Sequence, residues 1–386
     1  MRNYLFLLFL SITTFVSSQV ASIPFEKEGL VYIPVKIGEK ETPLTFVFDT
    51  GASTAVIDKT VAKRIGIKAD TKQYATGASG SQEYEIALNR TLTIANLDFN
   101  RLNFVLVDLE ELNNRSSMQI DGIIGYDVIK EFVTEFDFAE KQLYLYKKAK
   151  DIKDIADYTA HDIKLENAIP RVTLECTFLD GSKITGDFLF DSGANLGILF
   201  NTPFSEKHQL EDKFDKKITI SSRGLTATST SIVGLTKSVS LLGNTFTEVP
   251  ISLSQSKRGV SSQKGFAGIL GAEIINRFDM ILDYKKKKLY LKPNSYYKDA
   301  FEVPLVGFTI KKSGENIVIG DVIKDTEAAT KGIQSGDQLL AINGTAHTDL
   351  KTYRKLLKKE GQTIRIQLKK SSGKEDEIEL KLERLL

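Results

Sequence analysis

Short runs of apolar residues dominate residues 22–293 of the chain. They are rich in Val, Ile, Phe, Tyr and Thr, and Gly, Asn and Asp interrupt them. Runs of this length and composition, several of them alternating apolar with polar residues, are typical of β-strands. The clearest are "LVYIPVKI" (30–37), "LTFVF" (44–48), "FNRLNFVLV" (99–107) and "KQLYLY" (141–146). The pattern therefore predicts a mostly β protein.

A few short helices interrupt the strands. Asp58 is placed to cap "KTVAKRIG", which Gly66 ends, and Asn201 is placed to cap "TPFSEKHQ", with Pro203 in its first turn. The segments "GYDVIKEF" and "GAEIINRF" predict one further short helix each.

The two sets of elements are copies of one unit. "FVFDTG" around Asp49 matches "FLFDSG" around Asp191, at an offset of 142 residues (191 − 49). Further on, "DGIIGYDVIKEF" matches "AGILGAEIINRF" at an offset of 146 residues (271 − 125). A repeat of this kind indicates two structurally related lobes. We expect them over residues 19–150 and 151–298, with the polar stretch 147–162 as the linker.

The pattern changes after residue 298. Two strands in "GFTIKKSGENIVIGDVI", a short helix in "TEAATKG", a strand in "GIQSGDQLLAING" and an amphipathic helix in "TDLKTYRKLLKKEG" precede two closing strands. Residues 299–386 are therefore predicted to form a small separate α+β domain.

The first 18 residues have the pattern of a secretory signal peptide. Arg2 precedes the apolar stretch 5–16, and small residues stand before Gln19. We expect export to the periplasm or secretion. An uncleaved anchor is the alternative, although the stretch is short for a membrane span. No later segment is long and apolar enough to predict a transmembrane helix in the mature chain.

The net charge and the cysteine count argue against some classes of function and structure. The net charge of +2 argues against a nucleic-acid partner. The run Lys285–Lys288 is expected to be a solvated hairpin turn. Cys176 is the only cysteine, so an intrachain disulfide is impossible, and we expect it to be a small buried or edge residue of a strand.

The repeated Asp residues suggest a specific chemistry. A single Asp-Thr/Ser-Gly triplet is weak evidence, but two copies at equivalent repeat positions are rare. If a pseudo-twofold axis relates the lobes, Asp49 and Asp191 face each other there, and Gly51 and Gly193 permit close approach. Two adjacent carboxylates share one proton. Such a pair can hold a water molecule, deprotonate it and protonate a carbonyl oxygen, which is the chemistry of amide hydrolysis.

These motifs resemble those of the retropepsin/pepsin-like aspartic proteases, over about two-thirds of the chain. The resemblance implies that Asp49 and Asp191 are catalytic and that Thr50 and Ser192 cross-bond the two active-site loops. The family's hydrophobic-hydrophobic-Gly elements would be "IIG" and "ILG", which contain Ile124, Gly125, Leu270 and Gly271. The lobes look like a retropepsin subunit duplicated in one chain, related by a pseudo-twofold axis.

Family members cover the cleft with a β-hairpin flap. The Gly-rich stretch "YATGASGSQ" is the candidate in the first lobe, with Tyr74, Gly77 and Gly80 as flap residues. "SSRGLTA" (221–227) would lie opposite. Both sequences are also compatible with ordinary hairpin turns.

The C-terminal module is similar to a PDZ domain, most clearly in "GIQSGDQLLAING". The resemblance implies that backbone N–H groups of Leu305, Val306, Gly307 and Phe308 bind a peptide carboxylate. The peptide would add as a strand between residues 308–312 and the amphipathic helix, where Leu350 favours an apolar ligand residue. The alternative is that another part of this chain fills the groove.

Together these features predict an exported aspartic endopeptidase that acts on peptides or proteins and binds C-terminal peptides through its PDZ domain. No cofactor or metal is expected. The alternative is a catalytically inactive, chaperone-like peptide-binding protein on the same scaffold. Serine-triad and zinc chemistry lack support, because neither G-x-S-x-G nor H-E-x-x-H occurs and the three His residues are widely spaced.

Overall fold

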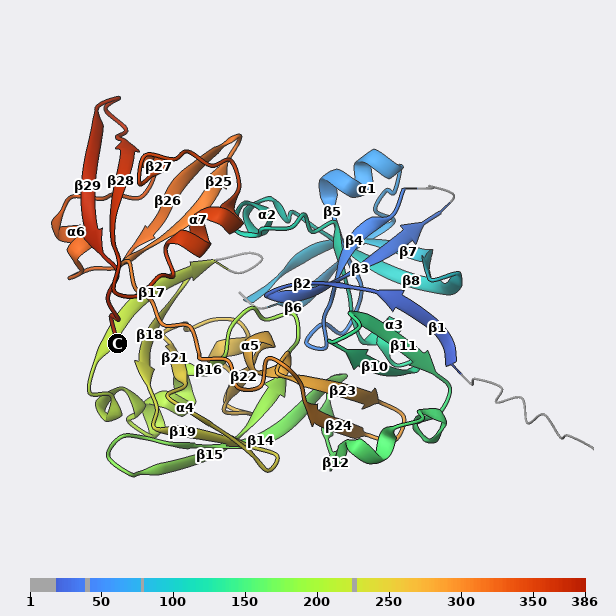
Figure 1. The fold of residues 1–386 in the computed structure, drawn as a ribbon. Helices are drawn as coiled ribbons and strands as arrows, with labels where there is room; N and C mark the ends of the chain where they lie inside the picture. Colours follow the sequence, from blue (N-terminus) through green and yellow to red (C-terminus); the bar gives the residue numbers. More distant parts are fainter. Residues whose placement is uncertain (1–18, 39–41, 78–79, 224–227) are drawn as a thin grey trace, which may run out of the picture.

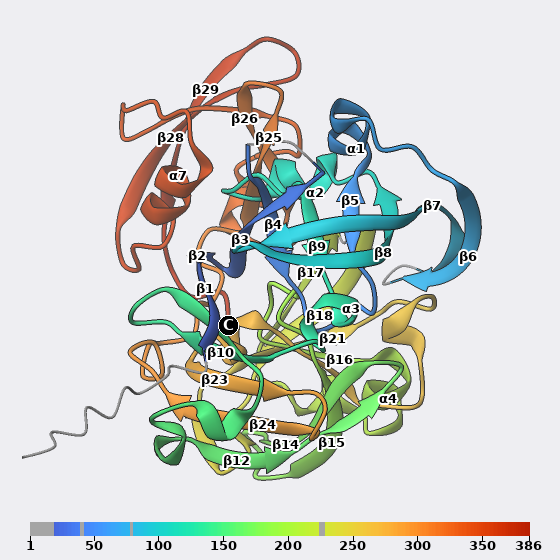
Figure 2. The ribbon, with the colours of Figure 1, turned by 90° about the vertical axis from the view of Figure 1, so that its right-hand side faces the viewer.

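The computed structural model describes residues 19–386, apart from residues 39–41, 78–79 and 224–227 (Figure 1). The expected signal peptide lies outside the described residues. In the part of the chain that the structure describes, no helix is long and apolar enough to cross a membrane. The described chain is mostly β and forms two lobes and a C-terminal domain (Figures 1 and 2).

The first lobe is built on an eight-stranded sheet with the order β2-β3-β4-β9-β5-β8-β7-β6. Strand β9 lies between β4 and β5, parallel to β4 and antiparallel to β5. The strands are β2 (Glu26–Glu28), β3 (Leu30–Ile37), β4 (Leu44–Phe48), β5 (Val56–Asp58), β6 (Thr71–Gly77), β7 (Gly80–Ile94), β8 (Leu97–Val107) and β9 (Gly122–Ile124).

The second lobe repeats this arrangement in a ten-stranded sheet. Its order β17-β18-β21-β16-β22-β15-β14 corresponds to β6-β7-β8-β5-β9-β4-β3, and β19 and β20 extend it. The repeat found in the sequence is thus a repeat of topology. The strands are β13 (Lys164–Glu166), β14 (Ile169–Thr177), β15 (Lys183–Phe190), β16 (Ile198–Phe200), β17 (Lys217–Arg223), β18 (Thr228–Leu235), β19 (Ser238–Leu241), β20 (Asn244–Thr247), β21 (Pro250–Ser254) and β22 (Gly268–Leu270).

A six-stranded sheet joins the lobes, in the order β1-β11-β10-β23-β24-β12. At its centre β10 pairs antiparallel with β23, and Glu135 lies opposite Ile281, its own counterpart in the repeat (281 − 146 = 135). A pseudo-twofold axis therefore passes through this pair. The strands are β1 (Gln19–Pro24), β10 (Val133–Asp137), β11 (Gln142–Tyr146), β12 (Thr159–Asp162), β23 (Phe278–Asp283) and β24 (Lys288–Pro293).

One hydrophobic core runs through both lobes. Phe46 and Phe136 from the first lobe and Phe188 and Phe278 from the second belong to the same buried cluster. Burying a Phe side chain contributes about 1.5–3 kcal/mol. Cys176 is a free thiol in this core, as expected, and burial raises its pKa to about 12.

The helices are short. In α1 (Lys59–Ile65), Asp58 accepts from the N–H groups of Thr60 and Val61, and Gly66 ends the helix at φ 83°, as predicted. Asn201 is the N-cap residue of α4 (Thr202–Lys207), as predicted, but its side chain does not cap the helix, because Nδ2 donates to the carbonyls of Gln263 and Phe266. The other helices of the lobes are α2 (Glu110–Arg115), α3 (Tyr126–Ile129) and α5 (Ala272–Ile275).

The predicted linker at residues 147–162 is instead folded. It contains the 3₁₀ turns η1 (Ala149–Asp151) and η2 (Ile155–Asp157) and ends in β12. Ala149 and Ile152 are buried in a small apolar cluster, so a few apolar residues within a polar stretch suffice to dock it. The remaining 3₁₀ turns are η3 (Leu210–Lys213) and η4 (Val260–Ser262). Lys285, Lys286 and Lys287 of the basic run lie in the turn between β23 and β24, as predicted, and Lys288 begins β24.

The C-terminal domain has its own core and a five-stranded sheet, β25-β26-β27-β28-β29. The predicted order of strands and helices is confirmed. The elements are β25 (Phe308–Ser313), β26 (Asn316–Val322), α6 (Glu327–Thr330), β27 (Gln338–Ile342), α7 (Leu350–Leu356), β28 (Thr363–Lys369) and β29 (Glu375–Lys381).

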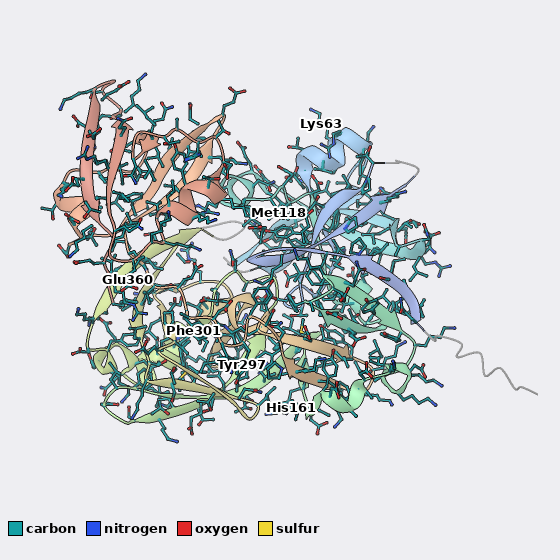
Figure 3. The ribbon with its side chains drawn as sticks, viewed as in Figure 1. Lys63, Met118, His161, Tyr297, Phe301 and Glu360 are labelled. Atoms are coloured by element: carbon teal, nitrogen blue, oxygen red, sulfur yellow. The ribbon has the colours of Figure 1, made fainter. Side chains whose placement is uncertain are left out.

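Arg277 fastens the segment that leads to this domain. Its guanidinium donates to the carbonyls of Tyr296 and Tyr297, each at 3.3 Å, and to that of Asp299. It also lies 3.8 Å from the centroid of the Phe301 ring. Figure 3 shows Tyr297 and Phe301 on the second lobe. The connection between lobe and domain is therefore held by a buried cation.

We predict that Arg277→Gln releases this connection. Loss of the hydrogen bonds from a charged donor costs about 1.5–3 kcal/mol, so local opening increases about tenfold or more. Trypsin should then cut after Lys298 at least ten times faster. Arg171→Gln, the same change at a half-buried arginine of this lobe, is the control. Equal cleavage rates in both variants would contradict this role.

Candidate active site

Asp49 and Asp191 follow directly on buried strands. β4 ends at Phe48 and β15 ends at Phe190, both at most 3% exposed. The Asp49 N–H donates to the carbonyl of Ile124 at 3.1 Å, and the Asp191 N–H donates to that of Leu270 at 2.9 Å. The apolar strands and the strands beside them thus hold both main chains in equivalent positions.

Hydroxyl groups bind each loop to the main chain of the other. Thr50 Oγ1 donates to the Phe190 carbonyl at 2.6 Å and accepts from the Ser192 N–H at 3.0 Å. Ser192 Oγ donates to the Phe48 carbonyl at 2.9 Å and accepts from the Thr50 N–H at 3.1 Å. Thr50 and Ser192 are at most 2% exposed. The structure thus contains a buried, reciprocal set of four hydrogen bonds across the pseudo-twofold axis.

The two glycines leave room for the opposite carboxyl. A Cβ on Gly51 would lie 2.4 Å from Asp191 Cγ, and a Cβ on Gly193 would lie 2.2 Å from Asp49 Cγ. Each glycine N–H also donates to the Asp of its own loop, at 2.7 Å for Gly51 and 3.0 Å for Gly193. Any side chain at these positions would push the carboxyls apart.

The protonation of each carboxyl depends on that of the other. Burial and the neighbouring Asp191 raise the pKa of Asp49 well above its usual value, against the effect of the N–H groups of Gly51 and Ala52. The pKa of Asp191 is also raised, because burial outweighs the lowering effect of its hydrogen bond with Asp49. The two carboxyls therefore titrate as a coupled pair, in which the charge on one disfavours ionisation of the other. The pair can both donate and accept a proton.

The hydrophobic-Gly elements lie directly against the loops. Ile124 and Leu270 end β9 and β22, and Gly125 and Gly271 follow. A Cβ on Gly125 would lie 2.5 Å from the Ala52 carbonyl oxygen, and a Cβ on Gly271 would lie 2.3 Å from that of Leu196. These glycines allow the close approach that positions the Asp loops.

The flap candidates form hairpins. β6 pairs with β7 up to Gly77 and Gly80, and Tyr74 on β6 is 79% exposed. β17 and β18 form the equivalent hairpin of the second lobe, and residues 224–227 lie outside the described part. Their role as flaps stays a prediction.

Sequence reasoning missed two groups at this site. Asp127 Oδ2 accepts from the Ala55 N–H at 3.0 Å and from Thr54 Oγ1 at 3.1 Å, which braces the chain after the first Asp loop. Tyr284 is buried near the carboxyls, which help raise its pKa, and its hydroxyl has no partner among the described residues. The repeat could have pointed to both positions. Asp127 aligns with a second acidic residue, Glu273, and Tyr284 aligns with a second aromatic residue, Phe138.

The candidate PDZ residues come together at one end of β25. Gly307 has φ 71° and precedes Phe308, the first residue of β25. Phe308 and Leu350, at the start of α7, share the domain core, and Leu305 and Val306 pack on it. Across the described ranges, no group of three or more His, Cys, Asp or Glu residues could hold a metal ion.

The fold and the paired Asp loops define a two-lobed aspartic-protease architecture followed by a PDZ domain. Comparison with family models agrees: the model described as aspartyl protease matches residues 33–128, and that of the PDZ domain matches residues 299–371. The chain therefore carries an aspartyl protease domain and a C-terminal PDZ domain, and the resemblance seen in the sequence is confirmed. No curated protein matches the chain.

We predict that Thr50→Ala destabilises the joined lobes. It leaves the Phe190 carbonyl and the Ser192 N–H buried without partners, at a cost of about 1–3 kcal/mol each. Thr50→Ser, which keeps the hydroxyl, should remain near the wild type. Urea unfolding of both variants provides the measurement, and equal midpoints for Ala and Ser would contradict the importance of the hydroxyl bonds.

Proposed function

We propose that the chain is an exported aspartic endopeptidase. The observation that carries the proposal is the half-buried Asp49–Asp191 pair, which the cross-bonded loops hold together. Desolvation and the neighbouring Asp191 raise the pKa of Asp49, which favours one proton shared by the pair. The apolar stretch before Gln19 is the basis for proposing export. A PDZ domain implies that the protein also binds peptides.

The pair supports a two-step hydrolysis. A water molecule between the carboxyls gives a proton to Asp191 while its oxygen attacks the peptide carbonyl carbon, and Asp49 protonates the carbonyl oxygen. The resulting gem-diol then collapses: Asp191 gives its proton to the amide nitrogen, Asp49 takes a proton from one gem-diol hydroxyl, and the C–N bond breaks to release an acid and an amine. Both steps use only the two carboxyls and water, so the proposal places Asp49 and Asp191 as catalytic residues.

Peptide cleavage by the purified protein tests this function. Asp49→Asn should reduce cleavage of a diverse peptide library at least 100-fold, because it removes the group that exchanges protons. Asp162→Asn removes one exposed carboxylate that pairs with Lys288 and should leave cleavage unchanged. Cleavage by Asp49→Asn at the wild-type rate, or no cleavage by the wild type at any pH from acid to neutral, would leave a peptide-binding protein as the better account.

The rate of cleavage should pass through a maximum as pH changes. Only the singly protonated pair is active, so the rate falls at low pH, where both carboxyls are protonated, and at high pH, where both are ionised. Because burial and mutual repulsion raise the pKa of Asp49, the active form extends above the ordinary titration range of an Asp. A rate measured from acid to neutral pH checks this, and a rate that rises steadily through neutral pH would contradict it.

The stability of the fold should also depend on pH through the Asp49–Asp191 pair. The raised pKa values mean that the folded state binds more protons than the unfolded state above about pH 4, so the pair's contribution to stability is lost as pH rises. Asp49→Asn removes the second charge and should gain thermal stability relative to the wild type on going from pH 4 to pH 7. A relative loss over this range would mean that the carboxyls do not share a proton.

A further inference from the structure

Strand β25 and helix α7 of the PDZ domain, between which a peptide is expected to bind, lie next to the first lobe. β25 is the edge strand of its sheet, and α7 is the helix packed beside it. Figures 1 and 2 show α2 of the first lobe next to β25, and Figure 1 shows it beside α7 as well. The place where a peptide strand would add to β25 is therefore next to another part of this chain.

Residues 110–118, here called the α2 segment, contact both walls of this groove. On the strand side, Glu111 Oε1 lies 3.2 Å from Lys311 Nζ of β25. On the helix side, Arg354 of α7 donates to the Arg115 carbonyl at 2.7 Å and to Ser117 Oγ at 3.2 Å. Arg354 lies one turn after Leu350, on the same face of α7.

The α2 segment runs along β25. Glu111 is beside Lys311, whereas Arg115 reaches Asp321 at 3.0 Å, next to the start of β25, since the Asp321 N–H donates to Thr309 Oγ1. Met118, labelled in Figure 3, packs against the apolar cluster of the first lobe at the end of the segment. The segment thus contacts Lys311 of β25 and Asp321 of β26, beside the edge that a peptide would join.

These charges form a network. Glu111 Oε1 accepts from both Lys311 and Arg115, and the side chains of Glu111, Lys311, Arg115 and Asp321 are each only 21–31% exposed. Partial burial acts to raise the pKa of Glu111, but the hydrogen bonds from Lys311 and Arg115 outweigh it and lower the pKa. Networks of half-buried charges bind more firmly than isolated surface pairs.

A helix cannot form ladder hydrogen bonds with the main-chain N–H and C=O groups at the edge of a strand. The main-chain groups of α2 bond within the helix, and in the described chain its hydrogen bonds to the PDZ domain use side chains and the carbonyl of Arg115. In the described chain no strand pairs with the outer edge of β25. A peptide strand would gain ladder hydrogen bonds there and a carboxylate site at the loop before Phe308. The α2 segment contacts both β25 and α7, so a peptide strand that added there would meet it.

We propose that the α2 segment is the resident occupant of the PDZ groove and that a peptide with a free C-terminal carboxylate binds by displacing it. The proposal concerns binding and does not depend on catalysis.

The same segment leads to the catalytic loop. Asn113 exchanges two hydrogen bonds with the main chain of Ile120, at 2.7 and 3.1 Å, and β9 follows, whose Ile124 carbonyl holds the Asp49 N–H. Displacement of the segment would therefore disturb the main chain that positions Asp49. Any resulting change in cleavage rests on the proposed function.

Peptide binding to the full chain tests the displacement. The probe is a fluorescein-labelled hexapeptide pool, randomised before a C-terminal Val, Leu or Phe, measured by anisotropy in an Asp49→Asn background so that it is not cleaved. Glu111→Gln removes the ion pairs to Lys311 and Arg115 without touching the groove walls. It should bind the pool at least fivefold more tightly, within the usual range of coupling between sites.

Two controls sharpen the result. Glu175→Gln removes a similar ion pair with Lys183 on the second lobe and should bind as the parent does. The same pool with amidated C-termini should bind weakly to every variant. Equal affinity of Glu111→Gln and the parent, or no binding of the acid pool to either, would overturn the proposal.

A cross-link supplies the opposite test. Cysteines at Glu111 and Lys311, joined by a short bismaleimide, lock the α2 segment onto β25. Buried Cys176, with its raised pKa, should not react. The linked protein should bind the pool at least fivefold more weakly than the same variant before linking. Equal binding before and after linking would show that the segment and the peptide do not compete.

Discussion

The reciprocal bonds between Thr50 and Ser192 are the interaction on which the rest of the structure depends. Two adjacent, half-buried carboxyls repel one another when both are charged, and nothing in either lobe alone would keep them together. The hydroxyls tie each Asp loop to the main chain of the other lobe, and the glycines beside them admit the opposite carboxyl. The resulting constraint is what lets one proton serve two groups.

This arrangement explains why both lobes and the sheet between them form one unit. The axis that pairs Glu135 with Ile281 in the six-stranded sheet also relates the two Asp loops, and one core extends through both lobes. The PDZ domain has a separate core, but Arg277 fastens its connection and the α2 segment contacts its groove. A second domain is thus coupled to the lobes by charges rather than by a shared core.

The sequence predicted the features that depend on local pattern. The two Asp loops, the hydrophobic-Gly elements and the cap of α1 by Asp58 each need only a short run of residues, and the repeat located them twice. It could not predict features that depend on distant partners. Asn201 bonds to carbonyls more than 60 residues away, and Arg354 bonds to a helix over 230 residues earlier in the chain. Such contacts exist only once the lobes and the domain have folded together.

The sharing of one proton by Asp49 and Asp191 is the central claim, and carboxyl titration tests it most directly. Protein labelled with ¹³C at the Asp side-chain carbon, compared with Asp191→Asn for assignment, would be followed by NMR as pH is raised. The account predicts two widely separated steps for the pair, with one proton retained well above the ordinary Asp value of 3.8. Two independent carboxyls that both ionise near that value would contradict it.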